Sequence, residues 1–272
     1  MKSKTVNMFV DADSIFFKIA YNSKNENALR KNFNSFCNTM KLAVKEKLTN
    51  PFDEEENFSV LYAIKGLNNF RKELSGDYKA KRPELDKEIR DKLNFLHSYA
   101  VTTKEAVEAT GMEADDLVSI WAYEARERKE QYVICGIDKD LLQIPGNHYN
   151  YSKDTWQFID DETAHYNLML QCLTGDSTDN IMGLKGIGPK KGAKLLEGIS
   201  SAALWDKVQD LWKEHGYHHE QCLMSYNLLR MLTSWKEYED IRSYIQNKTS
   251  VRKSNDVQKQ SDKADKVSKL SE

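Results

Sequence analysis

The sequence predicts an α/β fold, with a mostly parallel sheet flanked by helices. Three short apolar segments, 6–10, 58–64 and 132–137, are rich in β-branched and aromatic residues, as buried strands are. Between them, segments 27–48 and 116–129 carry apolar residues three and four positions apart, which is typical of amphipathic helices. Because strands and helices alternate, functional residues are expected at the carboxyl ends of the strands.

Acidic residues follow two of these strands. The first strand runs into FVDADS, which contains Asp11 and Asp13, and the third into GIDKDLL, which contains Asp138 and Asp140. A DxD after a strand is often only a turn residue beside a solvated neighbour. Since parallel strands end at one edge of a sheet, however, these four carboxylates are expected close together.

Two further acidic clusters lie elsewhere in the chain. GMEADDLVS opens a helix with Glu113, Asp115 and Asp116, and GDSTD contains Asp176 and Asp179, one turn apart if that stretch is helical. An acidic first helical turn is by itself an ordinary cap. Four clusters in one place would repel one another without bound cations. Oxygen ligands suit Mg²⁺ or Mn²⁺, and two such ions can serve phosphodiester hydrolysis, so a two-ion site is predicted.

The strand pattern fades after residue 160. Helical patterns follow at 164–173, 192–199 and 221–232. Residues 247–272 contain no aromatic residue and little that could build a core, so this tail is predicted to be disordered and outside the chemistry. The chain is therefore divided into an α/β domain, a smaller helical region and a polar tail, at 1–160, 161–246 and 247–272.

Two basic stretches are candidates for contacts with phosphate. GLKGIGPKKGAKLL combines glycines and lysines at a predicted helix start, where backbone amides and nearby cations bind phosphate without regard to base sequence. FRKELSGDYKAKRP interleaves aromatic and cationic residues, as in segments that guide single-stranded nucleic acid. Alone, each could be a solvated basic face. The candidate residues are Arg71, Lys72, Tyr78, Lys79, Lys81, Arg82, Gly186, Gly188, Lys190, Lys191 and Lys194.

Composition narrows the class of protein. The formal net charge is −2, so the chain is not a basic protein that coats nucleic acid indiscriminately. Its four cysteines are far apart and favour reduced, buried thiols over a disulfide or zinc framework. Neither a signal-type N-terminus nor an apolar run of membrane-spanning length is present. A cytoplasmic monomer without membrane contact is therefore expected.

Taken in order, five blocks resemble one family over about residues 6–245. They are FVDAD, FRKELSGDYKAKRP, GMEADDLVS, VICGIDKDLLQI and GDSTDNIMGLKGIGPKKGAKLL. They are similar to the 5′-nucleases of bacteria and bacteriophages, the flap endonucleases or 5′–3′ exonucleases. The last block, D-x-x-D-N followed by G-I-G-x-K, is the most specific. The resemblance implies a PIN-like α/β domain with a helical arch at about 66–95, and a helix–three-turn–helix region that binds DNA.

The resemblance also implies roles for individual residues. One metal ion would be held by Asp11, Glu113, Asp115 and Asp116. The other would be held by Asp138, Asp140, Asp176 and Asp179. The arch base would contact the scissile region through Tyr78, Lys79 and Arg82. The duplex-binding turn, which in the family can also hold K⁺, would comprise Gly186, Gly188, Lys190 and Lys191.

One position departs from the family pattern. The family ends its second strand with an aspartate ligand of the first metal ion, six residues before the Phe-Arg pair. This chain has Ile64 there, and an isoleucine cannot coordinate Mg²⁺. Either Asp13 compensates, or the first site is weak.

The expected function is a Mg²⁺-dependent, structure-selective 5′-nuclease acting on branched or 5′-ended DNA, with RNA in an RNA–DNA hybrid as a second substrate. One alternative is a protein of the same fold that binds branched DNA without cutting it, because of Ile64. The other is a haloacid-dehalogenase-type phosphatase, in which Asp11 would attack a phosphate monoester and Asp13 would act as acid and base.

Overall fold

The computed structural model of the chain describes residues 5–48 and 57–247. Residues up to Thr233 belong to one compact unit, and those from Ser234 to a second, in which residues 235–247 form a helix. The predicted polar tail lies outside the described residues, apart from residue 247 at the end of this helix. No helix in the described part of the chain is both long and apolar enough to span a membrane.

The first unit is built on a six-stranded sheet with the order β3-β2-β1-β4-β5-β6. Neighbouring strands are parallel except for β5 and β6, which are antiparallel. The predicted mostly parallel α/β fold is therefore confirmed. The strands are β1 (Thr5–Asp11), β2 (Asn57–Lys65), β3 (Val107–Ala109), β4 (Gln131–Cys135), β5 (Gly146–Asn150) and β6 (Thr155–Ile159).

Helices connect the strands and then form a separate group after β6. Between the strands lie α1 (Asp13–Tyr21), α2 (Glu26–Leu48), α3 (Phe70–Leu74), α4 (Lys87–Lys104), α5 (Ala114–Glu127) and the 3₁₀ helix η1 (Lys139–Gln143). After the sheet come α6 (Asp161–Thr174), α7 (Pro189–Leu196), the 3₁₀ helix η2 (Ser201–Ala203), α8 (Leu204–Glu214) and α9 (His219–Leu229).

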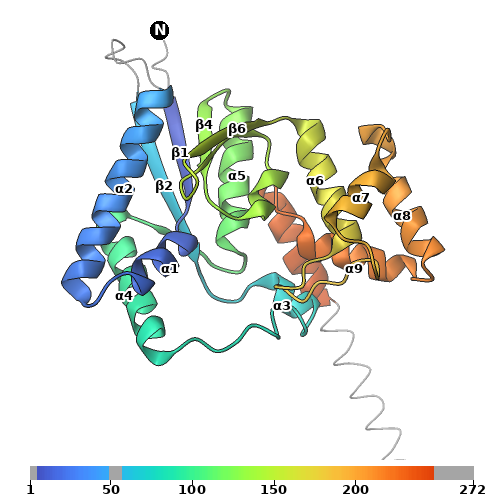
Figure 1. Cartoon of the computed structure of the whole chain (residues 1–272), viewed down its shortest axis with the longest axis horizontal. Helices are drawn as coiled ribbons and strands as arrows, with labels where there is room; N and C mark the ends of the chain where they lie inside the picture. The colour runs from blue at the N-terminus through green and yellow to red at the C-terminus, as the bar shows by residue number, and fades with distance from the viewer. Residues whose placement is uncertain (1–4, 49–56, 248–272) are drawn as a thin grey trace, which may run out of the picture. The chain divides into compact units, whose positions relative to one another are not determined.

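Helices cover both faces of the central strands. Met8 and Val10 of β1 belong to a buried cluster that also contains residues of α1, α2 and α4. Phe9, on the opposite face, packs beside Trp121 of α5, with ring centroids 5.9 Å apart and ring planes tilted by 43°. Figure 1 shows α1, α2 and α4 on one side of β1 and β2, and α5 on the other. Two covered faces explain why these strands are almost continuously apolar.

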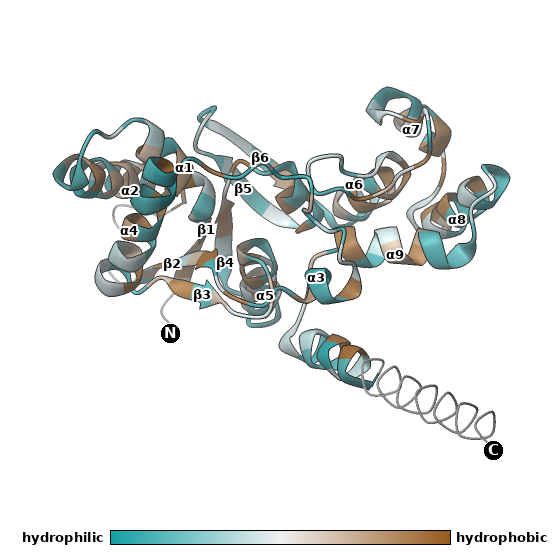
Figure 2. Cartoon of the chain, turned by 90° about the horizontal axis from the view of Figure 1, so that it is seen from below, coloured by the Kyte–Doolittle hydropathy of each residue, from teal (hydrophilic) through white to brown (hydrophobic). Residues whose placement is uncertain are grey.

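The helices after β6 have a core of their own around Trp212, whose indole N–H donates to the carbonyl oxygen of Cys172 over 3.1 Å. Buried Leu204, Val208 and Leu211 repeat at helical spacing along α8. Figure 2 shows α7 and α8 with a hydrophobic and a hydrophilic side. One side therefore packs inward, while the other is left for solvent or a ligand.

The segment expected to form a helical arch is helical only at α3 and from residue 87 onward. Only α3 and the start of α4 are helical between residues 66 and 95, and residues 75–86 are turns or irregular. Pro83 lies in this stretch and cannot donate a helical hydrogen bond. Tyr78 belongs to the buried cluster around Trp212, so part of the stretch packs on the helical group. An arch that encloses DNA stays a prediction.

Candidate active site

Asp11 is the last residue of β1 and is only 5% exposed. Its Oδ2 accepts a hydrogen bond from the Ser14 hydroxyl over 3.1 Å, and its Oδ1 accepts from the Asp13 backbone N–H over 3.2 Å. Burial, followed by the charge of Asp13, raises the pKa of Asp11 to about 7. Asp11 is therefore a buried carboxylate whose charge is only partly compensated.

Asp138 and Asp140 follow the neighbouring strand, β4. Asp138 caps η1, and its Oδ1 accepts from the Asp140 backbone N–H over 2.9 Å. The side-chain amide of Gln171 in α6 donates to Asp140. Burial, and then the charge of Asp138, raises the pKa of Asp140 to about 6. The predicted proximity of Asp11 and Asp138 is supported by the charge of Asp138, which also raises the pKa of Asp11.

The first turn of α5 contributes Glu113 and Asp115. Burial, and then the charges of Asp11, Asp138 and Glu113, raises the pKa of Asp115 well above its usual value. Carboxylates from β1, from the end of β4 and from α5 therefore lie within electrostatic reach of one another. Mutual repulsion of this kind marks a site that gains stability from a bound cation.

Asp176 and Asp179 lie in a tight loop rather than in a helix. Asp176 Oδ1 accepts from the backbone N–H groups of Thr178 and Asp179, over 2.8 and 3.2 Å. Asp176 also pairs with Ile181 in an isolated bridge. Gly175 has φ +65°, and a Cβ on Gly183 would lie 2.3 Å from backbone atoms of Thr174 and Gly175, so the closed loop needs glycine at both positions.

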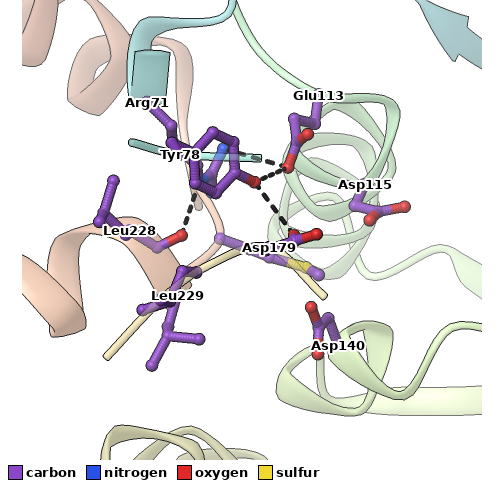
Figure 3. Close-up of a pocket in the computed structure, with 10 residues that line it drawn as sticks. Arg71, Tyr78, Glu113, Asp115, Asp140, Asp179, Leu228 and Leu229 are labelled. Atoms are coloured by element: carbon purple, nitrogen blue, oxygen red, sulfur yellow. Dashed lines mark hydrogen bonds and ion pairs between the residues drawn. The ribbon is translucent and has the colours of Figure 1, made fainter. Parts of the chain in front are cut away.

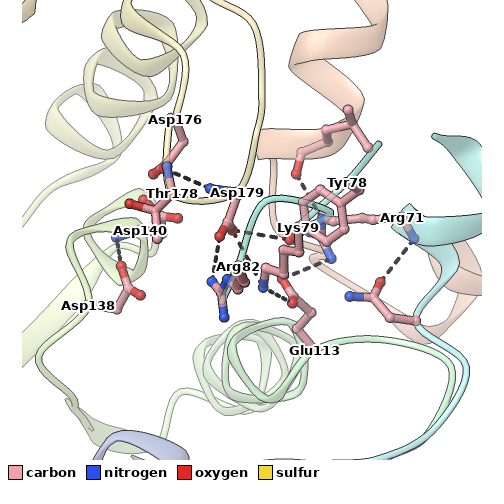
Figure 4. A network of polar contacts seen from close by, with 12 residues as sticks. Arg71, Tyr78, Lys79, Arg82, Glu113, Asp138, Asp140, Asp176, Thr178 and Asp179 are labelled. Atoms are coloured by element: carbon pink, nitrogen blue, oxygen red, sulfur yellow. Dashed lines mark hydrogen bonds and ion pairs between the residues drawn. The ribbon is translucent and has the colours of Figure 1, made fainter. Parts of the chain in front are cut away.

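The basic segment after α3 is attached to this loop. The backbone N–H of Lys79 donates to the carbonyl oxygen of Asp179 over 2.8 Å. The Tyr78 hydroxyl donates to Glu113 Oε2 over 2.7 Å and lies 3.3 Å from Asp179 Oδ2. The Lys79 ammonium pairs with Glu113, and the Arg82 guanidinium pairs with Asp179 (Figure 4). The predicted arch-base residues thus contact two predicted metal ligands.

Several of these side chains meet in one pocket. Tyr78, Glu113, Asp115, Asp140 and Asp179 all line it, together with Arg71 and apolar residues of and after α9 (Figure 3). The pocket thus collects carboxylates from α5, η1 and the loop after α6. In residues 5–48 and 57–247, no three His, Cys, Asp or Glu side chains are already close enough together to hold an ion.

Asp116 and Arg71 occupy different surroundings from those expected. Asp116 is fully buried, and Arg71 is 3% exposed. Arg71 donates to both carboxylate oxygens of Asp116, over 2.5 and 2.8 Å. The expected direct contact between Arg71 and DNA is therefore not supported, because its guanidinium points into the protein rather than to the surface.

Ile64 and Asp13 show how the second strand ends. Ile64 is completely buried in the same apolar cluster as Val10 and Ala12. Asp13 Oδ1 accepts a hydrogen bond over 3.1 Å from the backbone N–H of Lys65, the residue that follows Ile64. The carboxylate of Asp13 thus lies at the end of β2, beside the position where the family pattern has an aspartate.

The predicted duplex-binding turn lies at the start of α7. Gly188 precedes the helix and Pro189 is its first residue, so α7 begins three residues before the helical pattern predicted at 192–199. Gly186 has φ +78° and open space around its Cα. The expected cationic side chains are exposed, namely Lys190 and Lys191 here, Lys194 further along α7, and Lys72 and Lys81 near the arch base.

Sequence reasoning missed several partners of the carboxylates. Lys139, between two predicted ligands, pairs with Asp176 over 2.8 Å. Gln171 and Ser14 orient Asp140 and Asp11. The role of Lys139 could have been predicted from the sequence DKD after β4, because a cation between two carboxylates can neutralise acidic neighbours. The distant Gln171 left no such signal.

Comparison with known proteins gives the family. A model described as 5′-3′ exonuclease, N-terminal resolvase-like domain, matches residues 6–171, more than half of the chain. A 5′-3′ exonuclease of Buchnera aphidicola is 26% identical over 71% of this chain and 70% of its own length. Flap endonuclease Xni of Pectobacterium atrosepticum is 29% identical over 61% of this chain and 69% of its own length.

Longer relatives and solved structures agree. DNA polymerase I of Rhizobium leguminosarum is 32% identical over 60% of this chain, but the match spans only 17% of that polymerase. A zinc-bound T5 5′-exonuclease structure superposes with a TM-score of 0.64 at 18% identity, covering 89% of this chain and 98% of that one, which shows the shared fold. The chain therefore belongs to the 5′–3′ exonuclease family, whose members are nucleases that hydrolyse phosphodiester bonds.

Proposed function

We propose that the chain is a divalent-metal-dependent 5′-nuclease that cleaves branched or 5′-ended DNA. The observation that supports this most is that Asp11, Asp115 and Asp138 lie within electrostatic reach of one another: the charge of Asp138 raises the pKa of both Asp11 and Asp115, and the charge of Asp11 raises that of Asp115. Such an arrangement costs stability unless it serves to bind cations.

The donor set fits Mg²⁺ or Mn²⁺. The groups that approach one another are carboxylates, the hard oxygen ligands that these ions prefer. Asp11, Glu113 and Asp115, with Asp13, would hold one ion. Asp138, Asp140, Asp176 and Asp179 would hold the other. Two bound ions would offset phosphate charge and favour the ionisation of a water molecule.

The chain's own cations would orient the phosphate. Lys79 and Arg82 neutralise Glu113 and Asp179, which line the pocket. Once ions compensate these carboxylates, the same cations are available to the scissile phosphate and stabilise the charge that develops on it. The exposed lysines and the amides at the start of α7 would bind the duplex backbone without base specificity.

DNA is the proposed substrate because a T5 flap endonuclease of the same fold has been solved in a complex with DNA and metal ions. At 17% identity and a TM-score of 0.61, that likeness shows the fold alone. RNA in an RNA–DNA hybrid is proposed as a second substrate. A K⁺ ion at the start of α7 and a monomeric state stay predictions.

The test is an end-labelled 5′-flap duplex incubated with increasing Mg²⁺ or Mn²⁺. We expect cleavage near the junction that depends on the metal, and none with Asp138→Ala, which should still bind the flap. Asp210→Ala changes an exposed aspartate on α8 and serves as the matched control. Full cleavage by Asp138→Ala would refute the proposal.

A binding-only protein remains the second candidate because of Ile64. The buried position of Ile64 predicts that Ile64→Asp would place a carboxylate among apolar side chains and destabilise the fold, rather than restore a ligand. Asp13→Asn is the sharper variant, since Asp13 lies at the end of β2. Tight flap binding without product at any metal concentration would favour the second candidate.

The phosphatase alternative is separated from the nuclease by a parallel assay. Phosphate release from small monoesters, without cleavage of the flap, would favour it. The comparisons with known proteins lend it no support.

A further inference from the structure

Arg71 is the centre of a buried polar contact that joins three parts of the first unit. From α3, its two terminal nitrogens donate to Asp116 of α5. Its Nε donates to the carbonyl oxygen of Leu228 over 2.8 Å, and Nη2 also donates to that of Arg230 over 2.7 Å. Figure 3 shows the contact with Leu228, which lies near the end of α9. One guanidinium therefore connects α3, α5 and the chain after α9.

The carboxylate of Asp116 has no capacity left for a further ligand. Besides the two bonds from Arg71, its Oδ2 accepts from the Glu113 backbone N–H over 3.0 Å. Its Oδ1 accepts from the Leu232 backbone N–H over 3.1 Å. A carboxylate offers about four acceptor positions, so all of them are filled. Asp115, the preceding residue, instead lines the shared pocket.

We infer that Asp116 is a positioning residue that acts as the counter-ion of Arg71, and that it does not ligate the first metal ion. This inference rests on the proposed nuclease function. If Asp116 turned to an ion, the buried guanidinium would lose its closest compensating charge and keep only Glu113, whose Oε2 lies 3.9 Å from Nη1, and such a loss is costly inside a protein. The pair instead fixes the first turn of α5, and with it the directions of Glu113 and Asp115.

The same pair determines where the arch base lies. The segment with Tyr78 and Lys79 begins directly after α3, which carries Arg71. Because Arg71 bonds to α5 and to the end of α9 together, loosening it would change the geometry between Lys79 and Glu113. Arg71 thus acts on the reaction through the groups it positions, not by touching the substrate.

The test is a double-mutant cycle with Arg71→Gln and Asp116→Asn, read out as Mn²⁺ affinity by calorimetry without DNA. Each single substitution leaves one buried charge without its closest partner and should weaken Mn²⁺ binding about ten-fold, whereas the charge-neutral double variant should return to within about three-fold of the parent. Asp115→Asn is the comparison variant. Its loss of Mn²⁺ affinity should not be recovered by adding Arg71→Gln.

A double variant that binds Mn²⁺ no better than Asp116→Asn alone would overturn the inference, because a lost ligand cannot be restored through Arg71. The cleavage kinetics give a second readout. The singles should lower kcat while leaving the KM for the flap near its parental value, and the double should recover kcat.

Urea unfolding decides the outcome when a variant fails to fold or the parent binds no Mn²⁺. Folding of the double where the singles fail would support the pairing, and failure of all three would refute it. If the parent binds no Mn²⁺, the proposed function fails, while the urea midpoints of the four proteins still report whether the two charges are paired.

Discussion

Two groups of carboxylates in this protein differ in how their charge is compensated. In the paired group, protein cations neutralise the acids: Arg71 on Asp116, Lys79 on Glu113, Arg82 on Asp179 and Lys139 on Asp176. In the unpaired group, no ion pair within the described residues reaches the acids, which are Asp11, Asp115, Asp138 and Asp140.

Glu113 and Asp176 of the paired group differ from Asp11 and Asp115 of the unpaired group in the direction in which their pKa values move. Burial alone would raise the pKa of Glu113, but the charges of Arg71 and Lys79 lower it. Burial would also raise the pKa of Asp176, but the hydrogen bond and the charge of Lys139 lower it. Asp11 and Asp115, by contrast, have raised pKa values. The difference indicates that the unpaired group depends on bound cations, while the paired group organises the chain around it.

The largest effect is expected from removing one unpaired acid. Asp11→Asn should lower flap cleavage on the order of 10³-fold, as expected when a group that stabilises transition-state charge is lost. The metal-free variant should nevertheless unfold at higher urea than the parent at pH 8, because one repelling charge is gone. Cleavage rates and urea midpoints check this. If Asp11→Asn were inactive and also less stable than the parent, Asp11 would not belong to a group of carboxylates that repel one another.

The second expected effect is a loss of metal-free stability as the pH rises. Between pH about 4 and 7 the folded protein holds a proton on Asp11 that the unfolded chain has released, so stability present below pH 4 is lost as pH rises through 7. Asp11 alone would contribute roughly 4 kcal/mol over this whole pH range, about 3 kcal/mol of it between pH 5 and pH 8. Urea midpoints at pH 5 and pH 8 measure it, and Mg²⁺ should restore stability at pH 8 but hardly at pH 5.

A third effect concerns the paired group. Lys79→Met should lower kcat about 10²-fold, because the scissile phosphate loses a compensating cation. It should also destabilise the metal-free protein, since Glu113 keeps its charge without its partner. Unchanged stability together with a reduced kcat would show that the Lys79–Glu113 contact is not maintained in solution.

The smallest effect is expected at α7, away from both groups. Lys190→Ala with Lys191→Ala should weaken duplex binding and reduce the slope of log affinity against log salt by about 0.9 for each phosphate that is no longer neutralised. The stability and the metal dependence of cleavage should be unchanged. Fluorescence anisotropy with a labelled duplex at several salt concentrations measures this, with Lys213→Ala on α8 as the control.

Much of the fold could be read from local patterns. The predicted strands 6–10 and 58–64 correspond to β1 and β2, since buried strands covered on both faces leave an unmistakable apolar run. The strand predicted at 132–137 ends at Cys135 in β4. The hairpin of β5 and β6 was missed, because its residues are largely polar and partly exposed and show no such run.

The sequence predicts which acidic residues form the site better than it predicts the groups that contact them. The DxD motifs after β1 and β4 predict that Asp11 and Asp138 approach each other, because parallel neighbours end at one edge. The EADD motif does not reveal that Asp116 faces inward to Arg71 while Asp115 lines the pocket. That distinction depends on which side of α5 each side chain occupies, and on carbonyl groups far away in the sequence.

The bonds from Arg71 to Leu228 and Arg230 bear on how this protein can be divided. Similarity to the family model ends at residue 171, three residues before the end of α6, which suggests a convenient place to shorten the gene. A fragment ending there would lack both carbonyl acceptors and the Leu232 amide that holds Asp116. The end of α9 and the residues after it thus complete the surroundings of Arg71 and Asp116, and a fragment ending at residue 171 is expected to be less stable than the whole first unit.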